Sequence, residues 1–70
     1  MKHVSSHMAG VVVDILVKSG DSISAGMEIA ILESMKMQLP IESEIEGIVK
    51  EVKVNKGDFV NEGEPVLILE

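Results

Sequence analysis

Apolar and polar positions alternate in short runs along most of the chain, and the apolar residues are mainly valine and isoleucine. Two runs of this kind span residues 11–17 and 48–54. Each is followed by a Gly-Asp pair, which permits a tight turn, and then by a short apolar segment at Ile23 or Val60. Because β-branched side chains at this spacing suit half-buried strands, the pattern predicts strands separated by tight turns.

A helix is the competing interpretation for residues 47–56, since Val49 and Val52 stand three residues apart. Glycines flank this segment, and apolar residues alternate with Lys53 over residues 52–54, which favours a strand. The change of phase between Val49 and Val52 predicts a β-bulge. We expect little or no helix anywhere in the chain.

The chain contains an internal repeat. A shift of 37 residues lays residues 10–33 over residues 47–70 without a gap. Nine aligned pairs are identical: Gly10/Gly47, Val12/Val49, Val17/Val54, Gly20/Gly57, Asp21/Asp58, Gly26/Gly63, Ile31/Ile68, Leu32/Leu69 and Glu33/Glu70. Each copy reads as two main strands and a short one, and neither can bury its apolar face alone. We therefore predict an all-β fold, in which two antiparallel sheets form a flattened β-barrel or sandwich with pseudo-two-fold symmetry, a barrel-sandwich hybrid.

Residues 34–46 join the two copies and predict a hairpin. Residues 37–42 read as a strand that pairs back onto residues 27–34, which places Met35 and Lys36 at the hairpin tip. Two-residue hairpin turns prefer Asn-Gly or Asp-Gly, because both central residues need positive φ. Met35-Lys36 is a poor choice for stability, and strain of this kind tends to persist where function requires it. Lys36 is therefore the candidate functional residue.

Length, composition and charge narrow the classes of function. Seventy residues predict a single domain, 1–70, whose core must be aliphatic because Phe59 is the only aromatic residue. Without cysteine, neither disulfides nor a thiolate metal site is available. The net charge of −6 disfavours nucleic acid and anionic membrane surfaces as partners. The N-terminus has no apolar run suited to a signal or membrane segment, and Val4 and Met8 suit a short first strand, so we expect a cytoplasmic protein.

Other polar groups give weaker signals. His3 and His7 could share one strand face as metal ligands, but no third ligand is evident, so we assign no metal site. Glu42, Glu44 and Glu46 alternate and predict a solvated stripe, with docking to a basic partner surface as the second interpretation. No arrangement of serine, histidine and acid supports nucleophilic catalysis, and we assign no catalytic residue.

A lysine at a hairpin tip carries its amine into water on a flexible stem, which makes it a good acceptor for an acyl group. An exposed amine is mostly protonated at neutral pH, so an external enzyme must supply both an activated acyl donor and a base. In this interpretation the chain is the substrate of another enzyme and performs no catalysis itself.

The segment Ser34-Met35-Lys36-Met37, preceded by Glu33, resembles the Ala-Met-Lys-Met motif of the biotinyl/lipoyl attachment domains. The resemblance covers essentially the whole chain. It is close to free-standing biotin/lipoyl attachment proteins and to the biotin carboxyl carrier domains of biotin-dependent carboxylases. Lys36 falls on the lysine that receives biotin in that family, and the resemblance implies that Met35 and Met37 serve recognition beside it.

The methionines distinguish between two cofactors. Lipoyl domains typically carry Asp-Lys-Ala at the tip, so Met35 and Met37 favour biotin over lipoate. Ser34 stands where the tip motif has alanine. The Met-x-Gly segment of the family appears as Met8-Ala9-Gly10, and His7 precedes it at a position where a proline is common. Both are mild departures. The short segment 21–26 leaves no room for the "thumb" that some bacterial carriers insert.

The resemblance implies a mechanism. A biotin protein ligase would transfer biotin from biotinyl-adenylate to Lys36, and the biotin arm would then shuttle a carboxyl group between biotin carboxylase and carboxyltransferase sites. Two alternatives are a lipoyl carrier in an acyl-transfer complex, which would make lipoate the cofactor, and an unmodified β-sandwich interaction module. Because no linker rich in alanine and proline precedes Val4, we expect a free-standing protein, and a monomer, since a carrier must visit several sites.

Overall fold

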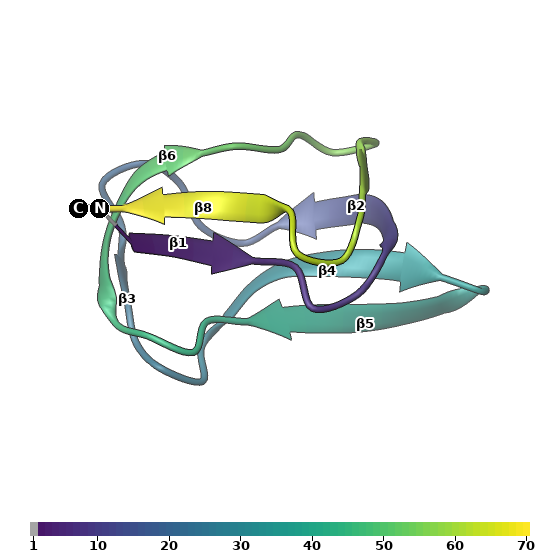
Figure 1. Cartoon of the computed structure of the whole chain (residues 1–70), viewed down its shortest axis with the longest axis horizontal. Coiled ribbons are helices and arrows are strands. Elements are labelled where there is room, and N and C mark those ends of the chain that lie inside the picture. Colours follow the sequence, from purple (N-terminus) through teal and green to yellow (C-terminus); the bar gives the residue numbers. More distant parts are fainter. Residues whose placement is uncertain (1) are drawn as a thin grey trace.

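The computed structural model describes residues 2–70 and consists of two four-stranded antiparallel sheets (Figure 1). One sheet has the strand order β1-β8-β6-β3 and the other the order β5-β4-β2-β7. The strands are β1 (Lys2–Ser5), β2 (Gly10–Ile15), β3 (Ser22–Ile23), β4 (Glu28–Ser34), β5 (Met37–Glu42), β6 (Gly47–Val52), β7 (Phe59–Val60) and β8 (Pro65–Leu69). Residues 2–70 contain no helix, and the predicted all-β fold of two antiparallel sheets is confirmed.

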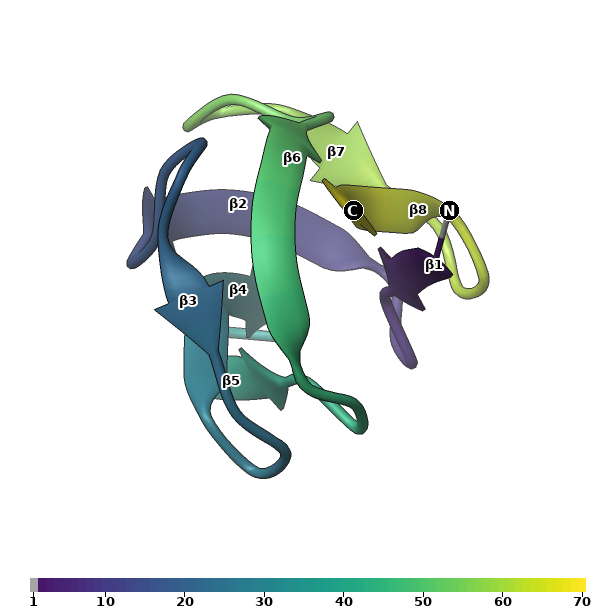
Figure 2. The same cartoon turned by 90° about the vertical axis from the view of Figure 1, so that its left-hand side faces the viewer.

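The two copies of the repeat interlock through their short strands. The short strand β3 of the first copy pairs with β6 of the second, and β7 of the second pairs with β2 of the first. The Gly-Asp turn carries the chain across to the other sheet, where Gly20 N donates to Val49 O and Val49 N donates to Asp21 O, both at 2.8 Å. Figure 2 shows β3 beside β6, with β2 in the layer behind them. The sequence predicts packing of the two copies but not this exchange of strands.

The pseudo-two-fold symmetry begins earlier than the repeat found in the sequence. Ser6 and Ser43, 37 residues apart, are both buried, and each hydroxyl donates to the backbone oxygen two residues further on, in Met8 or Ile45. Serine hydroxyls that bond locally compete with strand pairing. The sequence suggests a first strand that includes both Val4 and Met8. The local hydrogen bond of Ser6 explains why the strand ends at Ser5 instead. Serine is the only identical residue in the matching segments, which gives the sequence little signal of this extension.

A bulge interrupts β6 and the equivalent strand β2. In β6 the pairing with β8 shifts register between Val49 and Glu51, which confirms the predicted change of phase. Its counterpart in β2 lies between Val12 and Asp14. A bulge of this kind inserts one extra residue and increases the local twist, so the same strand can place both Val49 and a later residue against the core.

The core between the sheets is aliphatic, as the composition predicts. Phe59 takes no part in it, because 61% of this residue is exposed. With no aromatic residue in the core and no cysteine for a disulfide, stability rests on close packing of branched side chains. The buried cluster comprises Val4, Val12, Val17, Ile23, Ile29, Leu32, Ile41, Val49, Val54, Val60, Val66, Leu67 and Leu69.

Candidate functional site

The β4–β5 hairpin carries the candidate site. Six residue pairs join the two strands, and the last of them, Ser34 with Met37, closes a turn that contains only Met35 and Lys36. The predicted two-residue turn is therefore confirmed. Figure 1 shows the tip of this hairpin at one end of the molecule, and the start of β1 and the end of β8 at the other. The strands below the tip hold Lys36 clear of the rest of the fold.

Both residues of the turn have a left-handed backbone. Met35 has φ = 52° and Lys36 has φ = 67°, and they are the only non-glycine residues with positive φ within residues 2–70. Positive φ at both central residues defines a type I′ turn, whose twist matches that of the flanking strands. Non-glycine residues in this region cost about 1–3 kcal/mol each. The other positive-φ positions, such as Gly20 and Gly57, are glycines, so the fold elsewhere uses the residue suited to the conformation.

The side chains at the tip are in solvent. Met35 is 92% exposed, Met37 is 59% exposed, and Lys36 is also exposed. Lys36 takes no part in the ion pairs that join Lys53 to Glu51 and Lys56 to Asp14. An amine in this position can be reached from several directions by another protein. The geometry suits a lysine that serves as an acyl acceptor, with two flexible apolar side chains next to it.

We expect Met35→Asn to stabilise the fold by about 1 kcal/mol, because asparagine tolerates the left-handed region that a type I′ turn requires at this position. Little packing is lost, since Met35 is 92% exposed. Urea denaturation of both proteins measures the difference. Met37→Asn is the control, because Met37 does not have positive φ. An unchanged midpoint for Met35→Asn would show that the turn is not strained at this residue.

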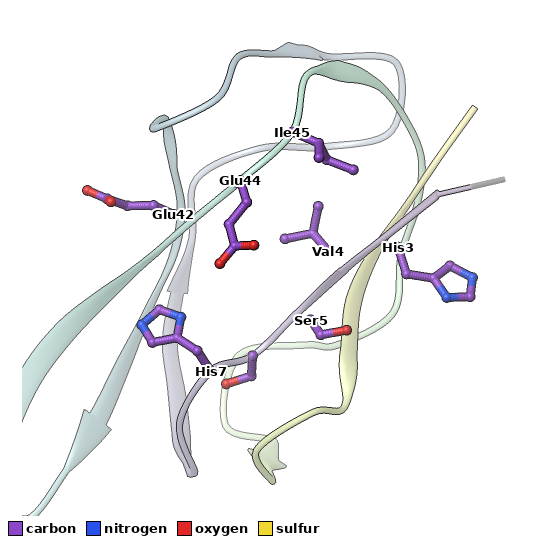
Figure 3. Close-up of a pocket in the computed structure, with 8 residues that line it drawn as sticks. His3, Val4, Ser5, His7, Glu42, Glu44 and Ile45 are labelled. Atoms are coloured by element: carbon purple, nitrogen blue, oxygen red, sulfur yellow. The ribbon is translucent and has the colours of Figure 1, made fainter.

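A cleft of about 290 Å³ lies between β1 and the end of β5, away from Lys36 (Figure 3). His3 and His7, the two candidate metal ligands of the sequence, both line it, but in Figure 3 their rings point in different directions. Within residues 2–70 no group of three or more histidine, cysteine, aspartate or glutamate residues could hold a metal ion.

Glu42, Glu44 and Glu46 are exposed, and the residues between them are buried or half-buried, so the predicted alternation is present. The strand nevertheless ends at Glu42, and the other two glutamates follow it in the bend that leads to β6. The bend forms where the hydroxyl of the buried Ser43 accepts a hydrogen bond from Ile45 N at 3.3 Å. The three carboxylates therefore do not lie along a single strand.

Comparison with known proteins identifies the family of the chain. A family model described as "Biotin-requiring enzyme" matches residues 2–69. The chain therefore belongs to the biotin/lipoyl attachment family, and it has the two-sheet fold described above.

Particular relatives support the same assignment. The "Biotin/lipoyl attachment protein" of Bacillus subtilis (strain 168) is 58% identical over 41 residues, which make up 59% of this chain and 56% of that protein. The chain thus spans little more than half the length of this curated relative.

No helix that could span a membrane is present in residues 2–70.

Two solved structures share the fold over nearly the whole chain. The urea carboxylase of Kluyveromyces lactis matches with a TM-score of 0.88 and 25% identity, covering 99% of this chain and 6% of that one. A single-chain, multi-domain long-chain acyl-CoA carboxylase matches with a TM-score of 0.83 and 30% identity, covering 94% of this chain and 7% of that one. In both cases the match is to a small part of a carboxylase.

Proposed function

We propose that this chain is a biotin carboxyl carrier and that Lys36 is the residue to which biotin is attached. The observation that carries the proposal is the exposed lysine at the hairpin tip, held between two methionines in a turn that is poor for stability. The carboxylase structures that share its fold favour biotin over lipoate. The whole of 1–70 then serves as one carrier domain.

The attachment step needs a partner enzyme. A biotin protein ligase presents biotinyl-adenylate, and Nζ of Lys36 attacks the acyl carbon. An amide bond forms, the acyl–phosphate bond breaks, AMP leaves, and the proton from Nζ passes to a base of the ligase. Met35 and Met37 offer adaptable apolar contact beside the amine during this step. The base comes from the ligase in this scheme, since the hairpin holds Lys36 away from the other strands.

Bound biotin supplies a carrier for a carboxyl group. The role of this chain is then to present the arm to two partner sites, a biotin carboxylase and a carboxyltransferase. Tethering raises the local concentration of the cofactor at each site far above its bulk value. The rigid strands β4 and β5 fix the point at which the arm begins. The chain itself performs no catalysis in this scheme.

Lipoate is the second candidate, because the name of the Bacillus relative includes both cofactors. Parallel incubations separate the two: one with a biotin protein ligase, biotin and ATP, and one with a lipoate ligase, lipoate and ATP. We expect the intact mass to rise by one biotinyl group in the first and to stay unchanged in the second. A lipoyl adduct alone would identify a lipoyl carrier, and no adduct in either arm would favour an unmodified interaction module.

A further inference from the structure

The only aromatic residue of the chain lies on the surface. Phe59 is 61% exposed on the short edge strand β7, whereas its neighbour Val60 is 1% exposed and points into the core. Phenylalanine carries a large apolar area and is usually used for packing. A single exposed apolar residue is ordinary, so the significance of Phe59 depends on what surrounds it.

Phe59 belongs to a row of side chains that crosses the outer face of the β5-β4-β2-β7 sheet. Phe59 pairs with Val11, Val11 pairs with Glu33, and Glu33 pairs with Gln38. Directly paired residues point to the same side of a sheet, and Val11 is 40% exposed. In the next row, Ile31 and Pro40 pair with each other and are half-buried. We call Val11, Ile31, Pro40 and Phe59 the outer apolar patch.

The pseudo-symmetry provides an internal control for this patch. The residue equivalent to Phe59 is Ser22, which pairs with Ile48 as Phe59 pairs with Val11. Ile48 is 40% exposed, the same fraction as Val11. The fold thus accepts a small polar residue where Phe59 stands. The aromatic side chain is present in only one of two equivalent positions, so the fold does not require it.

Of the two equivalent positions, 22 and 59, the one that carries the aromatic residue lies nearer to Lys36. The row through Glu33 and Gln38 lies two residues below the hairpin tip, about 7 Å along the strands. Phe59 is two strand spacings from β4, about 10 Å across the sheet. An interface side of typical area, about 800 Å², is about 32 Å across. A protein centred on Lys36 would therefore cover Phe59 as well.

We propose that the outer apolar patch is a docking surface for the biotin protein ligase, an inference that rests on the proposed attachment of biotin to Lys36. The ligase must bring its active site to an amine only one side chain away from the backbone. Once the arm is attached, the reacting group lies further out by the length of the cofactor chain, so the carboxylase sites need less contact with the sheet. The ligase is therefore the partner whose surface must lie against this face.

The patch also gives the ligase a means of choosing among lysines. The chain has six lysines, and the tip residues alone offer little area. An exposed aromatic residue beside Val11 provides the kind of anchor that concentrates binding energy in protein interfaces. The partner surface that fits is an apolar pocket for Phe59, with a basic group opposite Glu33 to complement its charge.

The test compares Phe59→Ser, which copies the serine found at position 22, with Ile48→Ser at the opposite end of the molecule. The rate of biotin transfer is measured with a biotin protein ligase, biotin and ATP at varied concentrations of each chain, and circular dichroism records folding. We expect kcat/KM to fall roughly tenfold for Phe59→Ser, mainly through KM, and to stay within about twofold of the parent for Ile48→Ser.

Equal rates for the parent and Phe59→Ser, or an equal loss in both variants, would overturn the docking surface. If the parent chain accepts no biotin, the proposed function fails instead, which separates the two results. The pair Val11→Thr and Ile48→Thr repeats the comparison with small β-branched side chains at both positions. It decides the question if Phe59→Ser does not fold: slower transfer to Val11→Thr alone supports the surface, and equal transfer rejects it.

Discussion

Lys36→Arg should abolish covalent attachment of the cofactor while leaving the fold unchanged. Arginine keeps the positive charge and the approximate length of the side chain, but its guanidinium is not a nucleophile at neutral pH. Lys36 is exposed and takes no part in the ion pairs of Lys53 and Lys56, so the substitution breaks neither ion pair and disturbs little packing. After incubation with ligase, biotin and ATP, intact-mass measurement should show the parent chain shifted by one biotinyl group and the variant unshifted.

Lys53→Arg is the matched control for this experiment. Lys53 is also exposed, and it lies 3.6 Å from Glu51, a contact that arginine can keep. Its labelling should equal that of the parent chain. Unfolding curves in urea should coincide for all three proteins, because arginine at the turn would have the same positive-φ strain as Lys36. Undiminished labelling of Lys36→Arg would mean that another of the six lysines receives the cofactor.

The sequence predicts the strands well because the internal repeat supplies the same evidence twice. The bulge near Val49 and the turn at Met35 and Lys36 could both be derived from the spacing of apolar residues. The exchange of β3 and β7 could not, because both copies have the same local pattern whichever sheet their short strands join. Strand partners depend on contacts that are distant in the sequence, which a local pattern does not contain.

The candidate site also has one part that the sequence predicts and one part that it does not. Lys36 could be found from the sequence, since its neighbours form a motif and its turn lacks the expected asparagine and glycine. The surface role proposed for Phe59 could not, because a lone aromatic residue beside Val60 reads equally well as core. The 61% exposure of Phe59 and its pairing with Val11 distinguish the two interpretations.

Gly10→Ala should destabilise the fold by about 2–3 kcal/mol. A Cβ at Gly10 would lie 2.7 Å from the backbone oxygen of Glu33, closer than real contacts allow, so either β2 or β4 must move. Gly10 does not have positive φ, and the effect is therefore steric. A domain of this length has a free energy of unfolding of only about 3–10 kcal/mol, so the change is a large fraction of the total. Urea denaturation measures it.

Gly47→Ala, at the equivalent position, is the control. There the nearest atom to the added Cβ is Cδ1 of Leu69, at 3.1 Å, and a side-chain end can shift where a backbone oxygen cannot. We expect a loss below about 1 kcal/mol. The two glycines also differ in which part of the chain they pack against. Gly10 packs against Glu33, which lies in the hairpin three residues before Lys36, whereas Gly47 packs against Leu69. Biotin transfer at a temperature where both variants are folded should therefore slow for Gly10→Ala and not for Gly47→Ala. A larger loss of stability in Gly47→Ala would show that close packing against Glu33 does not hold the hairpin in place.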